Sequence, residues 1–194
     1  MTTTTAFFLP SIIEQVHSVN SVTGRPSIQW DHSESIISTD SAASTRGTLY
    51  TISGFWQEKF YSETSQLNTS GYNIPANSGT LVGIELSLNA RRVARIQDLV
   101  IQLILNGELI GENRASLINP IQADMYTADT AVMLDPIDDF NIYGSSTDLW
   151  GTTLSAQDIT DASFGVAISF RSNMIYPHRD TVYLDQVGIR LTYA

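Results

Sequence analysis

The stretch Ile84-Glu-Leu-Ser-Leu-Asn-Ala-Arg91 decides the fold class of this chain. Apolar and polar residues alternate along it, which is the period that a β-strand shows when one face is buried and the other is solvated. The stretches Phe164–Arg171 and Thr181–Tyr193 repeat this alternation nearer the C-terminus. Because the chain contains no long helical pattern, we expect an antiparallel β protein.

Two local signals give the detail of this fold. Asn106-Gly107 stands between the apolar run Leu99–Leu105 and Glu108-Leu-Ile-Gly111, and both turn residues tolerate positive φ, so we expect a β-hairpin there. Ser155-Ala-Gln-Asp158 has the spacing of a helix cap and predicts one short helical turn.

The closing strand contains a change of parity. The apolar residues from Val187 to Tyr193 share one face, whereas Val182 and Leu184 have the opposite parity. One extra residue in the strand would bring both groups to the same side, so we expect a β-bulge around Asp185-Gln186.

Residues 1–46 differ from the rest of the chain. Ala6-Phe-Phe-Leu-Pro10 is a short apolar group, and the residues after His17 are rich in Ser, Thr, Asn and Asp. Pro10 to Val16 has the spacing of one or two helical turns, with Pro10 in the first turn and Ile12, Ile13 and Val16 on one side. We expect an N-terminal arm with edge-strand segments over residues 1–46 and a β-sandwich domain over residues 47–194.

Phe7, Phe8 and Leu9 are the candidate functional residues of the arm. Three large apolar side chains at a chain end are too few to form a core, and exposing them would favour aggregation. We therefore expect them to form an intersubunit anchor that docks into a groove on the next subunit. The alternative is that they fold back on their own sandwich.

Length and composition bound the architecture and the partners. With 194 residues and no cysteine, the chain suits a single domain that folds in a reducing cytoplasm without disulfides. We expect an all-β, antiparallel two-sheet β-sandwich of jelly-roll type with an extended N-terminal arm and one short helical turn. The net charge of −10 is unfavourable for nucleic acid and for anionic membranes, and we expect no secretion signal and no membrane span.

Few residues stand in patterns typical of catalytic or metal-binding sites. His17, His32 and His178 stand alone, without metal-ligand spacing, and no nucleophile or phosphate-binding motif occurs. We expect no catalytic residue and no cofactor. The richest acidic stretch offers structural calcium or a glycosidase-like carboxylate pair as alternatives, and its members are Asp124, Asp129, Asp135, Asp138 and Asp139.

Aromatic residues gather in one region of the sequence. They are Tyr50, Phe55, Trp56, Phe60, Tyr61 and Tyr72. Aromatic rings on an exposed sheet can stack on sugars, but strand alternation would put half of them in the core. We expect Trp56 to be a core residue, and the sugar platform remains the alternative.

The C-terminal half resembles a known module. Asp148-Leu-Trp-Gly151, Leu154-Ser-Ala-Gln-Asp-Ile159, Asp161-Ala-Ser-Phe-Gly-Val166 and Val182–Tyr193 follow in an order similar to that of a jelly-roll module of tailed-bacteriophage virion proteins, particularly cyanophage-like ones. Ile74-Pro75, Val82–Leu86 and Gln102–Asn113 resemble earlier parts of that module. Within the motif, Trp150 and Phe164 are expected to be core residues, and Gly151 and Gly165 to allow close backbone approach.

The resemblance implies a function in a particle. It indicates a structural component of a tailed-phage virion, made in the host cytoplasm and tail-associated as a fibre, adaptor or baseplate protein. Its partners would be other virion proteins and copies of itself, as a trimer or in a symmetric lattice. The alternatives are a capsid decoration (cement) protein and a carbohydrate-binding module that recognises a host surface glycan.

Overall fold

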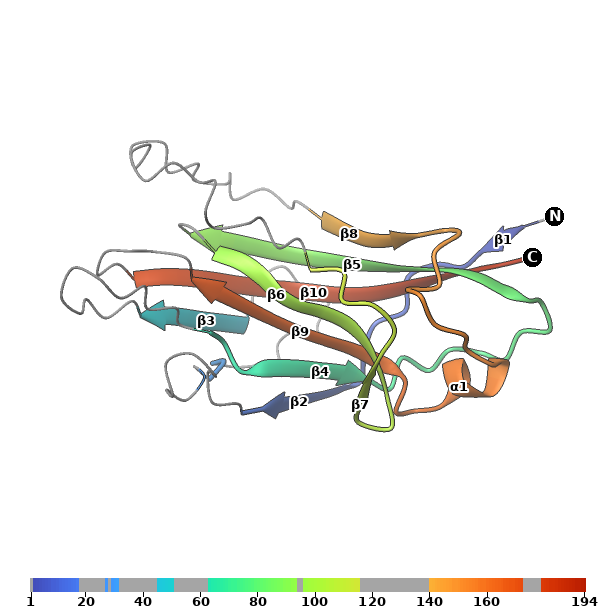
Figure 1. Ribbon diagram of the computed structural model, residues 1–194, viewed down its shortest axis with the longest axis horizontal. Helices are drawn as coiled ribbons and strands as arrows, with labels where there is room; N and C mark the ends of the chain where they lie inside the picture. Colours follow the sequence, from blue (N-terminus) through green and yellow to red (C-terminus); the bar gives the residue numbers. More distant parts are fainter. Residues whose placement is uncertain are drawn as a thin grey trace.

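The structure is a computed structural model of the chain, in which residues 2–17, 27, 29–31, 45–50, 63–93, 96–115, 140–172 and 179–194 are described. Two antiparallel β-sheets pack face to face, and one short helix, α1 (Ala156–Thr160), lies at the same end as both termini (Figure 1). The expected all-β two-sheet sandwich is confirmed.

The first sheet is built around the longest strand, β10 (Arg179–Tyr193). On one side β10 pairs with β5 (Leu81–Val93), which in turn pairs with β8 (Phe140–Ser145). On its other side, β10 pairs with β3 (Thr45–Tyr50) along its first half and with β1 (Thr3–Thr4) near its end. The C-terminal strand therefore joins segments from the whole length of the chain.

The second sheet contains five strands in the order β2-β4-β9-β6-β7. Their bounds are β2 (Ile12–Val16), β4 (Gln66–Ser70), β9 (Gly165–Ser172), β6 (Ile96–Leu105) and β7 (Glu108–Ile110). The chain crosses from one sheet to the other at every connection between consecutive named strands except the one from β6 to β7. Each of these strands can therefore bury one face against the opposite sheet.

The core lies between the sheets and follows the alternation in the sequence. Ile84, Leu86 and Leu88 of β5 have no exposed surface, and Val166, Ile168 and Phe170 of β9 face them from the other sheet. Trp30 contributes an edge-to-face contact with Phe170, with ring centroids 5.9 Å apart.

Three local predictions are confirmed. Asn106 and Gly107 form the turn between β6 and β7, with φ of 54° and 79°. The Ser155 side chain accepts a hydrogen bond from the backbone N–H of Asp158, whose carboxylate accepts from the backbone N–H of Ser155, so the capping box is complete. The pairing of β10 with β5 shifts between Leu184 and Gln186, which is the expected bulge, and the apolar side chains on both sides of it are buried.

The helical turns predicted for Pro10–Val16 were wrong, because Ile12–Val16 is strand β2. It pairs with β4 in antiparallel register from Ile12 opposite Ser70 to Val16 opposite Gln66. A helix of two turns cannot offset its own nucleation cost, whereas pairing with an existing sheet satisfies the backbone at once and suits β-branched side chains. Within the described residues of the arm, β1 and β2 are its edge-strand segments.

Candidate functional site: the N-terminal strand segment

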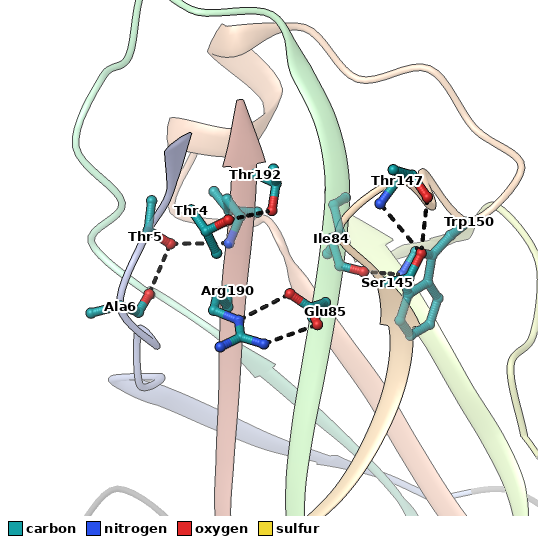
Figure 2. A network of polar contacts seen from close by, with 11 residues as sticks. Thr4, Thr5, Ala6, Ile84, Glu85, Ser145, Thr147, Trp150, Arg190 and Thr192 are labelled. Carbon is teal, nitrogen blue, oxygen red and sulfur yellow. Dashed lines mark hydrogen bonds and ion pairs between the residues drawn. The ribbon is translucent and has the colours of Figure 1, made fainter. Parts of the chain in front are cut away.

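The N-terminal residues 3–8 run along the outer edge of β10. Besides the β1 pairing, the N–H of Thr5 donates to the carbonyl of Leu191 at 2.9 Å, and Phe8 and Ile189 exchange two backbone hydrogen bonds of 2.7 and 2.9 Å. At Thr5 the side chain takes over the acceptor role, because its Oγ1 accepts the N–H of Leu191 at 3.0 Å (Figure 2). The segment is thus attached mainly by main-chain hydrogen bonds to a sheet edge.

A stacked ion pair lies beside this segment. The Arg190 guanidinium donates two hydrogen bonds to the Glu85 carboxylate, at 2.9 and 3.0 Å (Figure 2). The same guanidinium lies 4.6 Å from the ring centroid of Phe7. A bidentate geometry fixes the guanidinium plane, and the aromatic face adds an electrostatic attraction of about 0.5–1 kcal/mol at an exposed site. The interaction links β5, β10 and the N-terminal segment in one row.

The structure places the predicted anchor residues on their own domain. Phe8 packs against the hydrophobic core, whereas Phe7 is 38% exposed and lies with Leu9 over the backbone of Gly188. Pro10, which follows, is buried. The three residues therefore have different surroundings, and this arrangement is the alternative in which the anchor contacts its own sandwich.

Exposed apolar side chains are concentrated in this N-terminal segment. Three of the five large exposed hydrophobic residues of the described chain are Phe7, Ile12 and Val16, at 38%, 50% and 38% exposure. Ile12 and Val16 were expected on a helix, so the sequence did not reveal that they share the outer face of a strand. The contribution of Arg190 and Glu85 was also missed, and their pairing depends on the register between β5 and β10.

Trp150 lies at one end of the core. It has no exposed surface, its indole Nε1 donates to the carbonyl of Ile84 at 3.0 Å, and its φ is 59° (Figure 2). Gly144 allows this position, because a Cβ there would lie 2.6 Å from the indole nitrogen. Gly151, the next residue, has φ of 66°, and a Cβ there would lie 2.7 Å from a carboxylate oxygen of Glu112.

Phe164 and Gly165 stand at the entry to β9. Phe164 is 1% exposed and forms part of the core. A Cβ at Gly165 would overlap the carbonyl oxygen of Thr69 on the neighbouring strand β4. The glycine is therefore required by the close approach of two backbones.

One Ser–His contact has the distance of a catalytic pair but not its accessibility. Nδ1 of His17 lies 2.9 Å from Oγ of Ser65, which also contacts the Ser27 hydroxyl at 3.0 Å. Ser65 has no exposed surface, so a substrate cannot reach its hydroxyl in this structure. The carbonyl of Ser65 accepts the indole N–H of Trp30 at 2.8 Å. Ser65 therefore helps to hold Trp30 beside the start of β4.

Several predicted candidates lie outside the described residues. The acidic stretch Asp124–Asp139 and the aromatic residues from Phe55 to Tyr61, including Trp56, are among them. Tyr72 is described and is a core residue at 4% exposure. Within the described ranges, no three His, Asp or Glu residues are grouped as a metal site would require, and no helix is long and apolar enough to cross a membrane.

Comparison of the chain with protein-family models, with curated proteins and with solved structures gives no match.

Proposed function

We propose that this protein is a structural component of a tailed-phage virion, tail-associated as a fibre, adaptor or baseplate protein, and that it acts through protein–protein contacts. The proposal is supported by the sequence resemblance and by one structural observation, the exposure of two apolar side chains, Ile12 and Val16, on the outer face of the edge strand β2. Apolar side chains exposed together on one face indicate a contact surface.

The geometry suits a contact with a neighbouring subunit. Phe8, Pro10 and the half-buried Ile13 hold the segment to the sandwich, while Phe7, Ile12 and Val16 point outward. The inward residues keep the backbone in place, so the outward side chains are ordered before a partner arrives. Binding by a preordered strand avoids most of the entropy loss that a free arm would bring.

The test is the composition of purified particles. A strain whose phage encodes this chain is lysed, and the particles are purified and analysed by mass spectrometry and electron microscopy with a labelled chain. We expect the chain in the particle at a fixed stoichiometry and at the tail. A chain found only in the soluble fraction of the lysate would contradict the proposal, and a label on the head would favour the capsid decoration alternative.

A variant separates a contact role from folding. Ile12→Ser combined with Val16→Ser removes two exposed apolar side chains, so the melting temperature should stay close to that of the wild type, while incorporation into particles should fall. Ile142→Ser is the matched control, because Ile142 is also exposed, at 48%, but lies on β8 of the other sheet. Equal incorporation of all three proteins would contradict a contact role for the segment.

A further inference from the structure

The N-terminal residues 3–8 are held to β10 mainly through their backbone. The side chains of Thr3, Thr4, Ala6 and Phe7 are exposed, and within this segment Phe8 is the one residue that packs against the hydrophobic core. An element with little buried apolar surface, attached by hydrogen bonds at a sheet edge, opens at a lower free energy than the core does. The segment therefore has the properties of a locally unstable element.

Strand β10 does not depend on this segment for its place in the first sheet. On its other side β10 pairs with β5 from Thr181 to Tyr193. The side chains of Ile189 and Leu191, which lie next to the segment, have no exposed surface and belong to the core. If the segment left, β10 would remain paired with β5 and packed against the second sheet.

A fixed point follows the segment directly. Pro10 is buried and has no N–H, so it cannot donate a further hydrogen bond to β10. The N–H of Ser11 donates to the carbonyl of Ser70 at 3.0 Å, and its hydroxyl donates to the carbonyl of Gly71 at 2.6 Å. From Ser11 onward the chain is therefore fastened to the second sheet, and a motion of the N-terminal segment ends at Leu9.

We propose that residues 3–8 form a strap that opens from β10 as a unit while both sheets stay folded. The closed form is the major one, because it pairs the backbone groups and covers the ring of Phe8. Opening uncovers the outer edge of β10 at Ile189 and Leu191, and an uncovered strand edge is where another extended chain can add. The closed strap protects this edge, whether or not the chain belongs to a virion.

Hydrogen exchange within β10 tests the proposal, because successive N–H groups of a strand point to opposite edges. The N–H groups of Ile189 and Leu191 donate to the strap, at the carbonyl of Phe8 and at Oγ1 of Thr5. The N–H of Arg190, between them, points toward β5. In the purified full-length chain we expect Ile189 and Leu191 to exchange at least about 100-fold faster than Arg190, as measured by NMR and corrected for intrinsic rates. Equal protection of the three amides would overturn the proposal, because the strap and the sheet would then open together.

A disulfide that closes the strap is the second test. Thr4 and Thr192 are directly opposite in the strand pairing, and their Oγ1 atoms are 3.2 Å apart (Figure 2). The chain contains no cysteine, so Thr4→Cys combined with Thr192→Cys gives one defined disulfide, at a Cα separation that opposed strand residues provide. Oxidation should slow the exchange of Ile189 and Leu191 by at least about tenfold relative to Arg190, and reduction should restore the wild-type ratio.

The same variant distinguishes the strap from other arrangements. Thr4→Cys alone is the matched control and should exchange like the wild type. If the closed disulfide leaves the exchange of Ile189 and Leu191 unchanged, these amides open by another route and the strap is wrong. A disulfide that joins two chains at low protein concentration would also overturn the proposal, because the segment would then lie on a second copy. Since these measurements use the purified chain alone, their failure is distinct from absence of the chain from particles.

Discussion

The indole Nε1 of Trp150 donates a hydrogen bond of 3.0 Å to the backbone carbonyl of Ile84, a residue 66 positions earlier in the chain. The N–H of the same residue, Ile84, donates to the carbonyl of Asp148 at 2.9 Å. The backbone N–H and the carbonyl of Ile84 therefore both bind the loop before α1 and hold it to the start of β5. The Trp150 ring is fully buried in the core.

Replacing Trp150 separates the hydrogen bond from the packing. Trp150→Phe keeps an aromatic ring but leaves the carbonyl of Ile84 without this donor, and we expect a loss of about 1–3 kcal/mol in the free energy of unfolding. Trp150→Ala also empties the site and should cost about 3–5 kcal/mol. Urea denaturation measures both. Equal losses for the two variants would show that the hydrogen bond contributes little.

Gly165 and Gly188 differ in the space that a side chain would have. A Cβ at Gly165 overlaps the Thr69 carbonyl, whereas a Cβ at Gly188 would make ordinary contacts at 3.4 Å to Phe7 and 3.6 Å to Leu9. We expect Gly165→Ala to destabilise the protein by about 1–3 kcal/mol, the scale of an overpacked site. Gly188→Ala should change the stability little. Thermal denaturation by calorimetry is the measurement, and the reverse order would contradict the structure.

The two phenylalanines of the N-terminal segment should behave differently. Phe8→Ala removes a side chain that packs on the core and should cost about 1.5–3 kcal/mol. Phe7→Ala removes an exposed ring and its contact with Arg190, which should cost less than about 1 kcal/mol. Chemical denaturation of the two variants compares them. For the same reason, deletion of residues 1–16 is expected to lower the melting temperature, and point variants are the better test of docking.

Tyr72 gives the protein a sensitivity to alkaline pH. Burial raises the pKa of Tyr72 well above its usual range, although the hydrogen bond with Thr69 at 2.6 Å partly opposes this effect. The folded state therefore holds a proton that the unfolded chain releases near pH 10. Protonated Tyr72 therefore contributes to the free energy of unfolding below pH 10, and this contribution is lost as the pH rises above that value. Tyr72→Phe should flatten the fall in stability above pH 10, and an unchanged pH profile would contradict the assignment.

Asp158 gives an opposite sensitivity at acid pH. Hydrogen bonds from the Ser155 side chain and then from its backbone lower the pKa of the Asp158 carboxyl below its ordinary value of 3.8. The stabilisation is present above pH 3.8 and is lost as the pH falls through the lower folded value. We expect Asp158→Asn to lower the melting temperature at pH 6 and to have little effect near pH 2. A difference between the two proteins that stays constant over this range would rule out the carboxylate as the source.

Part of the candidate site could be predicted from the sequence. Phe7, Phe8 and Leu9 stood out because three large apolar side chains at a chain end are too few to form a core, and this can be seen without a structure. The sequence could not show that Phe8 faces the core while Phe7 contacts Arg190, because that depends on the pairing of Phe8 with Ile189, which is 181 residues away. The exposure of Ile12 and Val16 was missed for the same reason, since their spacing fits a helix as well as a strand.

The sequence by itself determined the features that depend on near neighbours. The alternation in β5, the Asn106-Gly107 turn, the Ser155 cap and the bulge before Gln186 each follow from side chains within a few positions, whose backbone preferences act locally. Tertiary structure alone decided which strands lie side by side, that Ile12–Val16 is a strand, and that Arg190 meets Glu85. In a sheet the stabilising partner of each residue comes from a distant part of the chain, so the free energy that selects these contacts exists only once the strands have been brought together.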